Sequence, residues 1–517
     1  MRRSRILVGL ATLVAALWSA AGPVLPVSAA APADGAAVAL VPDALRVSAV
    51  PWSVAPAAGA LMTGTLATAT VAGIPAPQDA PADTTDAVAT IDPTPAAAGP
   101  IVTAPGPSGK EPSLRMRATY DVDADVGWTT RVVRVDTRID IVNTSGGPAS
   151  RIVLNTVAAK IGGMRLRSVV VDGKPVSVTV RDQSILVPLK PAQPAGASFT
   201  VRVKYSGRVG LSTAGHSWMW AKQNDVMNLY RFIPWLSRAV PFNRDNHGDP
   251  FVLPTSPQVR VTLTSDRPLT WATSGERVSA EGRTQTFVAR NVRDFNATAS
   301  PDYQVTSART ADGDTLVRVY TIHGRGDLLM KSTLRALKAF EAEVGPYPWP
   351  VYNVAESAGG FAMESPALIW MPMTEFTDAD VRYITAHETA HQWFYGAIGN
   401  DQTTDMFADE AMSDFLSRRL VDRMRGSLCP KDRFDKTLYQ YSGACYFETI
   451  YVQGSRWIDD LRRAMGDGPF WATLRRYYQD NLFTISSDKT LLEAWRATAG
   501  DRLLGRYRVR FPSLYPK

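Results

Sequence analysis

Apolar and polar residues alternate along a series of short segments between residues 113 and 305. Segments with this pattern include RVVRVDTRIDIVN, RIVLNTV, VSVTV, SFTVRVKYSG and QVRVTLTSD, and turn-forming residues separate them. A period of two puts neighbouring side chains on opposite faces of a strand, so that one face can pack on a core. The pattern predicts a domain of antiparallel β-strands over residues 113–308.

From Arg309 onward the apolar positions mostly recur at helical spacing. DLLMKSTLRALKAFEAEVG has the period of an amphipathic helix, and Gly345 supplies its stop signal. A strand pattern, TLVRVYTIHG, precedes this helix, and PYPWPVYNVAE after it is typical of a turn and a strand. We therefore expect a mostly helical second domain over residues 309–517, and a multidomain α+β protein.

The first 112 residues show neither pattern. A basic start, MRRSR, leads into the apolar run Ile6–Ala21 and then into small residues, which is typical of a secretory signal peptide over residues 1–30. The run is shorter than the roughly 20 residues of a membrane-spanning helix, so cleavage is favoured over an uncleaved anchor. Residues 31–112, rich in Ala, Pro, Gly and Thr, are interpreted as a flexible linker. We expect a secreted or cell-envelope protein without a stable membrane span.

Composition agrees with this organisation. The chain has 517 residues with 45% hydrophobic content, which is too long for one ordinary domain and sufficient for sizeable cores. The net charge of +7 is spread among interspersed acids, so we expect a solvated basic surface and no nucleic-acid partner. Only Cys429 and Cys445 could form a disulfide, which an exported protein favours; two free buried thiols are the alternative.

The segment AHETAHQWF carries the first chemical signal. It lies in TDADVRYITAHETAHQWFYGAIG, which begins with cap-like residues and is predicted to be a helix. His387 and His391 would project from one face of this helix, with a spacing that lets both imidazoles bind one zinc ion. Glu388 would lie beside the metal, within reach of a water molecule. The alternative is an ordinary polar helix face, although the chain has only five histidines.

A second predicted helix, TTDMFADEAMSDFLSRRLVDRMRG, adds Glu410 after eighteen intervening residues. Three protein ligands leave one position of a tetrahedral zinc ion open, as catalysis requires, whereas a closed structural site favours cysteine ligands. The sequence therefore predicts one catalytic Zn²⁺ per chain. Asp409 is interpreted as a charge at the helix start, and Asp414 as a candidate to orient a zinc-binding histidine.

This arrangement resembles the gluzincin zinc metallopeptidases of the aminopeptidase N family. HETAHQWFYGAIGNDQ is similar to the family's zinc-helix segment, GGFAMESPALIW to its G-x-M-E-N motif, and YVQGSRW to its Y-E-K-G motif. VRDFNATASPDY resembles the end of the family's saddle-like β domain. The resemblance covers roughly residues 115–505 and implies a saddle-like domain followed by a thermolysin-like catalytic domain. It also implies a short bacterial-type member that lacks the large C-terminal helical domain.

The resemblance implies a role for each matching residue. The zinc ligands and the general base would be His387, His391, Glu410 and Glu388. Glu364 would grip the free α-amino group of the substrate, with Ala362 and Met363 beside it in the substrate-binding segment. Tyr451 would donate a hydrogen bond to the oxygen where negative charge develops, with Tyr446 as the alternative. These roles imply an exported aminopeptidase that acts on peptides or oligopeptides.

The sequence departs from the family at several positions, and two alternatives to an aminopeptidase remain open. The departures are Phe361, Ser365, Phe407, Ala411, Val452 and Gln453. None of them removes a metal ligand, but they bear on aminopeptidase specificity. The first alternative is a thermolysin-type endopeptidase, because DEAMSD resembles N-E-A-x-S-D; against it, the spacing is one residue shorter and no histidine follows His391. The second alternative is a catalytically silent zinc-binding relative.

Overall fold

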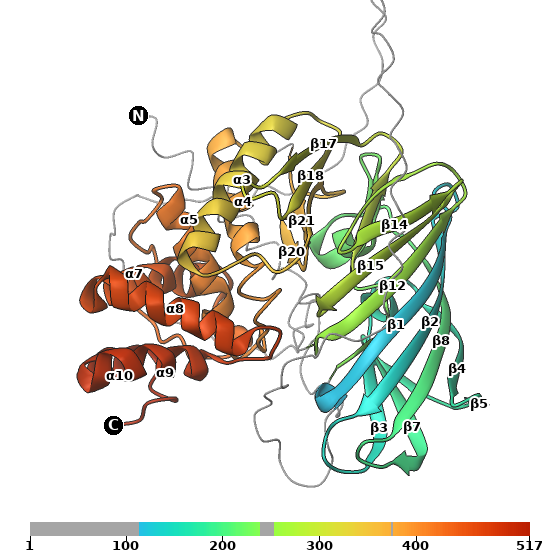
Figure 1. Ribbon diagram of the computed structural model, residues 1–517, viewed down its shortest axis with the longest axis horizontal. Helices are drawn as coiled ribbons and strands as arrows, with labels where there is room; N and C mark the ends of the chain where they lie inside the picture. Colours follow the sequence, from blue (N-terminus) through green and yellow to red (C-terminus); the bar gives the residue numbers. More distant parts are fainter. Residues whose placement is uncertain (1–112, 238–252, 374–375) are drawn as a thin grey trace, which may run out of the picture. The chain divides into compact units, whose positions relative to one another are not determined.

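The computed structural model describes residues 113–237, 253–373 and 376–517. The predicted signal peptide (1–30) and linker (31–112) lie outside the described residues. The described residues all belong to one compact unit of the chain, which contains Pro95–Lys517. Strands dominate its first half and helices its second half (Figure 1).

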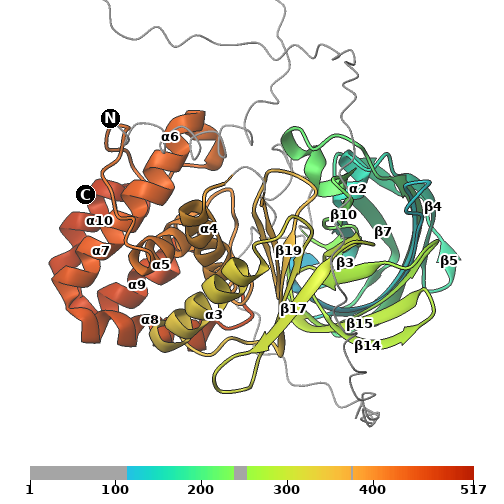
Figure 2. The same cartoon turned by 90° about the horizontal axis from the view of Figure 1, so that it is seen from above.

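An eight-stranded sheet with the order β14-β15-β12-β1-β2-β8-β4-β5 forms most of the first half. Its strands are β1 (Met116–Val126), β2 (Val132–Asn143), β4 (Arg165–Val171), β5 (Lys174–Pro175), β8 (Ser198–Arg208), β12 (Ser256–Ser265), β14 (Glu276–Glu281) and β15 (Thr284–Val292). Along β1 every second residue is buried, as the sequence period predicted. Seen from above, the sheet is strongly curved (Figure 2).

The expected antiparallel pairing is wrong for one central pair of strands. β1 and β12 run parallel, with Tyr120 opposite Val259. Parallel neighbours need a long crossover, and the chain between Val126 and Ser256 supplies one. Alternation of apolar and polar residues fixes which face of a strand is buried, but it does not fix the direction of the neighbouring strand.

Two four-stranded sheets lie on the path of this crossover and just beyond it. One has the order β13-β16-β10-β9, the other β11-β3-β7-β6. Their strands are β3 (Ala149–Asn155), β6 (Thr179–Arg181), β7 (Ser184–Gln193), β9 (Lys222–Gln223), β10 (Val226–Leu229), β11 (Trp235–Leu236), β13 (Thr270–Thr273) and β16 (Ala297–Ser300). The short helix α2 (Val157–Lys160) follows β3, and η2 (Gly215–Trp220) precedes β9.

A five-stranded mixed sheet, β17-β18-β19-β21-β20, opens the second half. Its strands are β17 (Gln304–Arg309), β18 (Leu316–Thr321), β19 (Val351–Glu356), β20 (Met363–Ser365) and β21 (Leu368–Met371). β18, β19 and β21 are parallel, and β17 and β20 are antiparallel edge strands. Because β17 pairs with β18, this sheet begins a few residues before the predicted boundary at 308.

Helices α3 (Gly326–Glu343) and α4 (Asp378–Ala390) pack against this sheet and against each other. The helical segments that follow are η3 (Phe407–Ala411), α5 (Met412–Leu420), η4 (Leu438–Gln440), α6 (Gly443–Phe447), η5 (Glu448–Gln453), α7 (Gly454–Met465), α8 (Asp467–Asn481), α9 (Asp488–Ala499), η6 (Gly500–Leu503) and α10 (Leu504–Arg510). η3 and η5 are single turns of π-helix. Over the described ranges, no helix is long and apolar enough to cross a membrane.

The predicted disulfide between Cys429 and Cys445 is present, with a Cα–Cα distance of 5.7 Å. It joins the loop after α5 to α6, which leads into η5. Other contacts hold the same loop: Arg425 forms two hydrogen bonds with the Glu448 carboxylate, at 2.6 and 2.9 Å. The Gln453 amide donates to the carbonyl of Pro430 at 2.9 Å. The loop is therefore fixed to both ends of η5.

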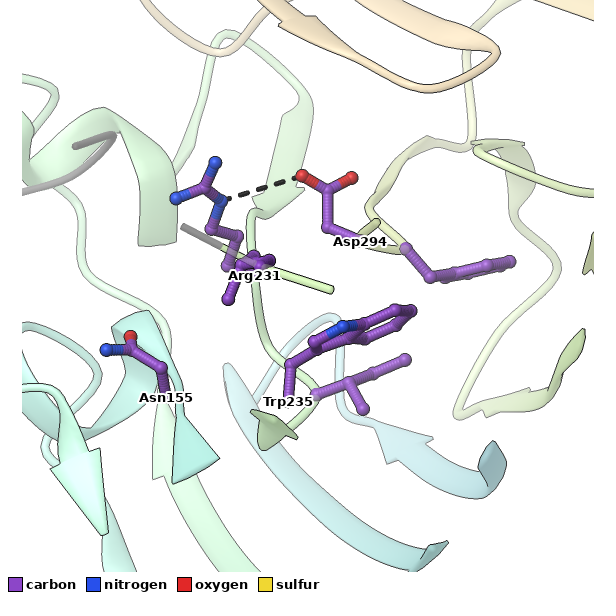
Figure 3. A pocket seen from close by; sticks show the side chains of 7 residues that line it. Asn155, Arg231, Trp235 and Asp294 are labelled. Atoms are coloured by element: carbon purple, nitrogen blue, oxygen red, sulfur yellow. Dashed lines mark ion pairs between the residues drawn. The ribbon is translucent and has the colours of Figure 1, made fainter. Parts of the chain in front are cut away.

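A buried ion pair supports the strands that lie closest to the second half. Arg231 and Asp294 are 4% and 2% exposed, and their Nε and Oδ2 atoms are 3.6 Å apart (Figure 3). They line a small cavity of about 10 Å³ together with Trp235 and other residues of the β-sheet half. Tyr395 extends the pair into the second half, since it accepts a hydrogen bond from Arg231 at 2.8 Å and donates one to Asp294.

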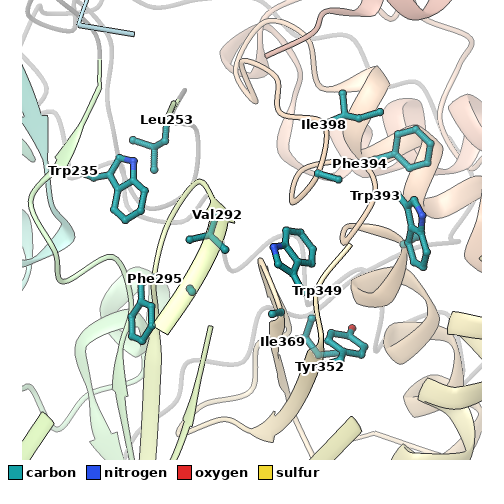
Figure 4. Packing of buried hydrophobic residues seen from close by; sticks show 14 of the residues in the cluster. Trp235, Leu253, Val292, Phe295, Trp349, Tyr352, Ile369, Trp393, Phe394 and Ile398 are labelled. Atoms are coloured by element: carbon teal, nitrogen blue, oxygen red, sulfur yellow. The ribbon is translucent and has the colours of Figure 1, made fainter. Parts of the chain in front are cut away.

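The apolar core is continuous between the two halves of this unit. Trp235, Phe295 and Val292 from the sheet half and Trp349, Trp393 and Ile398 from the second half belong to one cluster (Figure 4). Arg293 lies inside this region and is 2% exposed. Its guanidinium donates to the carbonyls of Leu253, Gly396, Ala397 and Thr484 at 3.1–3.4 Å. Burial lowers the pKa of Arg293 to about 10, so it remains charged at neutral pH.

Replacing Arg293 with methionine should therefore destabilise the protein more than an ordinary surface substitution. Arg293→Met keeps most of the apolar stem but takes one donor from each of four buried carbonyls, of which those of Ala397 and Thr484 keep a backbone donor. We expect a loss of about 3 kcal/mol in the free energy of unfolding. Urea denaturation measures this loss. Arg290→Met, at an exposed position of β15 three residues before Arg293, is the control and should change the free energy of unfolding by less than about 0.5 kcal/mol. Equal effects of the two substitutions would contradict the role of the buried guanidinium.

Candidate metal centre

Helix α4 positions the two predicted zinc-binding histidines. The helix begins with a capping box, in which the Thr377 hydroxyl accepts from the backbone of Asp380 and the Asp380 carboxylate accepts from the backbone of Thr377. It ends at His391, earlier than the predicted run into Gly396. The Nε2 atoms of His387 and His391 lie 3.1 Å apart.

Glu410, on the π-helical turn η3, completes a compact set of three ligand atoms. Its Oε2 atom lies 3.4 Å from Nε2 of His387 and 3.4 Å from Nε2 of His391. Ligands bonded to a tetrahedral zinc ion at about 2.0–2.1 Å are themselves separated by about 3.3–3.4 Å. The three atoms thus already have the spacing that one zinc ion requires, and the donor set of two imidazoles and one carboxylate suits zinc.

Each histidine has a carboxylate near its other ring nitrogen. His391 Nδ1 lies 2.7 Å from Oδ1 of Asp409, which is 1% exposed. His387 Nδ1 lies 3.8 Å from Oδ1 of Asp414. The Asp414 carboxylate accepts hydrogen bonds from Tyr383 on Oδ1 and from Arg418 on Oδ2. At 2.7 Å the Asp409 carboxylate can hold the proton on Nδ1 of His391 and leave Nε2 available for a metal. The distance of 3.8 Å between His387 and Asp414 is too long for a hydrogen bond.

Sequence reasoning missed the orienting contact of Asp409. It interpreted this residue as a charge at a helix start, and it gave the orienting role to Asp414. The π-helical turn makes the difference, because it directs both Asp409 and the adjacent Glu410 toward the histidines. Its position directly before the third ligand was the only signal available in the sequence.

The charges around the ligands favour a cation. For Glu410, burial alone would raise the pKa, but the His391 and His387 imidazoles hold it well below its ordinary value. Burial lowers the pKa of His387. For His391 burial acts in the same direction, but the carboxylates of Glu364, Asp409 and Glu410 outweigh it and raise the pKa. A divalent cation among these carboxylates would offset their mutual repulsion.

Strand β20 brings the predicted amine anchor to the same place. Glu364 is 5% exposed, and a carboxylate oxygen of it lies within 4.8 Å of ligand atoms of both Glu388 and His391. Met363, also on β20, is buried in an aromatic cluster, whereas Ala362 is partly exposed just before the strand. The structure therefore brings the predicted substrate-binding segment next to the predicted general base.

Tyr451 lies on η5 and contacts His387, one of the two predicted zinc-binding histidines. Its ring stacks on His387 with centroids 5.5 Å apart. Burial, together with the nearby Glu410 carboxylate that accepts a hydrogen bond from it, raises the pKa of Tyr451 well above its ordinary value. Tyr446 packs edge-on against Tyr451, with centroids 5.9 Å apart. Tyr451 thus remains a protonated donor beside the ligand set.

Comparison with curated proteins finds short matches to aminopeptidase RNPEPL1 and to leukotriene A-4 hydrolase. Mouse and human aminopeptidase RNPEPL1 are each 31% identical to this chain over 99 residues, which is 18% of this chain and 13% of theirs. Leukotriene A-4 hydrolase of Xenopus laevis is 29% identical over 98 residues, 18% of this chain and 16% of the enzyme. This chain therefore matches only a small fraction of the length of these curated relatives. No known family profile matches the sequence.

Solved structures match over a much larger part of the chain. The M1 zinc metallopeptidase of Deinococcus radiodurans has a TM-score of 0.59 and 20% identity, covering 76% of this chain and 93% of that one. A mutant of the same enzyme was solved with a Tyr-Ser-Ala substrate and matches equally well. The chain thus has the fold of M1 zinc metallopeptidases, with a sheet-rich N-terminal part and a helical C-terminal part. The family resemblance that the sequence motifs indicated is confirmed.

Removing the charge of Asp409 should weaken zinc binding without removing a ligand. Asp409→Asn retains the shape of the side chain but cannot hold the His391 proton as a carboxylate does, and we expect the zinc dissociation constant to rise about 10–100-fold. Competition with a chromophoric chelator measures the constant. Asp460→Asn, on the exposed face of α7, is the control and should leave it unchanged. An unchanged constant for Asp409→Asn would show that this carboxylate does not support His391.

Proposed function

We propose that this chain is an exported zinc-dependent metallopeptidase with a thermolysin-like catalytic domain, and that it removes N-terminal residues from peptides. The observation that carries the proposal is the proximity of Glu364 to Glu388 and to the zinc ligand His391, all within 4.8 Å. A carboxylate at that distance can bind the free ammonium group of a substrate while its first peptide bond lies at the metal. The M1 fold and the aminopeptidase relatives support the same reading.

One Zn²⁺ per chain would be held by His387, His391 and Glu410. When bound, the ion acidifies a water molecule and polarises the scissile carbonyl. Glu388 acts as the general base: its carboxylate accepts the proton of the attacking water and passes it to the departing amine. Because Glu388 follows His387 on α4 and is 6% exposed, its carboxylate stays next to the ligand set and largely away from bulk water.

The other two residues act on the substrate. Tyr451 donates its hydroxyl to the carbonyl oxygen as negative charge develops there, which stabilises the transition state more than the ground state. Its stacking on His387 keeps the donor beside the metal. Glu364 binds the terminal ammonium, with Met363 and Ala362 in the adjoining segment that runs along the substrate. Binding of the terminal ammonium at Glu364 therefore determines which peptide bond is cleaved.

Export rests on the sequence of residues 1–30 and agrees with the disulfide Cys429–Cys445, because disulfides persist in oxidising compartments. In this proposal the mature protein is released or held at the cell envelope. Its partners are peptides or oligopeptides, and nucleic acids are not among them.

Glu388→Gln tests the proposed chemistry. The substitution keeps the size of the side chain and removes the base, so turnover should fall at least about 100-fold while zinc content stays the same. Hydrolysis of aminoacyl arylamides and of N-acetylated peptides, with metal analysis of each sample, gives the result. Wild-type protein should cleave the free-amine substrates and lose this activity to a chelator. Cleavage of the blocked peptides alone would indicate a thermolysin-type endopeptidase, and bound zinc without any turnover a silent relative.

Tyr451→Phe tests the donor to the oxyanion. Loss of one such donor should lower kcat by about 100-fold or more, with zinc content intact. Tyr446→Phe, five residues earlier on the same helical segment, is the matched control and should have a much smaller effect on kcat. If Tyr446→Phe lowers kcat and Tyr451→Phe does not, Tyr446 is the donor to the oxyanion and the assignment of Tyr451 is wrong.

A further inference from the structure

The loop between α4 and η3 carries a buried glutamine, Gln402, that lies between two carboxylates. We infer that Gln402 is a positioning residue for the proposed aminopeptidase reaction. Its side chain couples the amine anchor Glu364 to the zinc ligand His391, and in this way it enforces the preference for a free N-terminus. The inference rests on the proposed function. Nothing in the sequence pattern marks Gln402, since it is a single polar residue in a loop.

The contacts of Gln402 form a continuous path. Its side-chain nitrogen donates to Oε1 of Glu364 at 3.2 Å and to Oδ2 of Asp409 at 3.2 Å. The other oxygen of Asp409 lies 2.7 Å from Nδ1 of His391. Gln402 is 8% exposed, so these hydrogen bonds are largely protected from competition by water. A single amide therefore connects the residue that would bind the ammonium to a residue that would bind the metal.

An amide suits this position for an electrostatic reason. Glu364 and Asp409 are both carboxylates, and two negative side chains that share a buried site repel each other. The NH₂ group of Gln402 offers two protons, one for each carboxylate, and adds no net charge. Lysine would neutralise the negative charge that attracts a substrate ammonium, and glutamate would add to the repulsion. A carboxylate has about four acceptor sites, so the bond from Gln402 does not exhaust the capacity of Glu364 to receive an ammonium.

The backbone around Glu364 is fixed separately. Gln392, the residue after His391, accepts from the backbone of Ala367 at 2.9 Å and donates to the carbonyl of Ser365 at 3.0 Å. The Ser365 hydroxyl donates to Asp294 at 2.8 Å. The strand that carries Glu364 is thus held on both sides whatever occupies position 402. What Gln402 adds is the direction of the carboxylate itself.

Because other contacts hold the backbone and Gln402 directs only the Glu364 carboxylate, loss of Gln402 should affect only substrates with a free amine. Without the amide, the Glu364 carboxylate can turn away from its position near Glu388, and substrates lose part of the binding of their ammonium group. Substrates with a blocked N-terminus do not use that interaction and should be unaffected. A residue that only stabilised the loop would change the cleavage of both kinds of substrate equally, in proportion to the fraction of folded protein.

The main test compares Gln402→Met with wild type. Methionine has a similar length and volume but no donor. We expect KM for aminoacyl arylamides to rise about tenfold, as loss of a hydrogen bond to a charged group does, with kcat within about threefold. Residual cleavage of N-acetylated peptides should not change. Gln183→Met, a buried glutamine of the sheet half outside the site, is the matched control and should leave both KM values unchanged.

A binding measurement makes the result independent of turnover. In a Glu388→Gln background, calorimetry gives the Kd of a dipeptide with a free amine and of its N-acetylated counterpart. Addition of Gln402→Met should weaken the first about tenfold and leave the second unchanged. Gln402→Asn should act in the same direction, because its amide is one methylene short of spanning both carboxylates. This second variant keeps the test valid if the methionine variant folds poorly.

The outcomes separate the inference from the proposed function. Equal losses for free and blocked substrates, or no change in either Kd, would overturn the role of Gln402 while leaving the aminopeptidase activity of the wild type in place. A wild-type protein that does not distinguish free from blocked N-termini would instead refute the proposed function, and with it the inference.

Discussion

The repulsion among buried carboxylates is the constraint on which the second half of this structure depends. Glu364, Glu388 and Asp409 are each at most 6% exposed, and Glu410 lies with them around two histidines. Such a cluster is stable only if each negative charge meets a cation or a hydrogen-bond donor. The histidines, the amide of Gln402 and the hydroxyl of Tyr451 supply donors. The divalent ion that the ligand spacing fits would supply the remaining compensation.

The sheet-rich half stabilises this cluster through hydrogen bonds to the segments that carry its residues. Arg293 binds four backbone carbonyls, among them two in the turn that follows α4. Arg231 and Asp294 reach the same turn through Tyr395 and reach strand β20 through Ser365. These polar groups are buried in an otherwise apolar core, so each partner fixes the next one in place. These contacts therefore help to hold the turn after α4 and strand β20 in place.

The sequence predicted the parts of the fold that depend on local pattern. Alternation located the long strands, the helical period located α3, and the capping residues located the start of α4. It did not predict the parallel pairing of β1 with β12, because pairing direction depends on where the chain travels between the two strands. The π-helical turn at Phe407–Ala411 was likewise not visible in the pattern, and with it the contact of Asp409 was missed. Motif spacing found the residues that form the candidate metal centre, whereas the loop residue Gln402 is recognised only through its contacts.

Two departures from the family motif around Glu364 can be understood from their neighbours. Ser365 replaces an asparagine, yet its hydroxyl accepts from the Asn296 amide at 2.8 Å while it donates to Asp294. An amide from the neighbouring strand region thus complements the shorter side chain. Phe361 replaces a glycine, and its ring stacks on Trp218 with centroids 5.9 Å apart. The added bulk is held in an aromatic cluster at the beginning of the segment. Both changes therefore keep the strand in place. Under the proposed function, the selection of a free N-terminus would still depend on how the Glu364 carboxylate is directed.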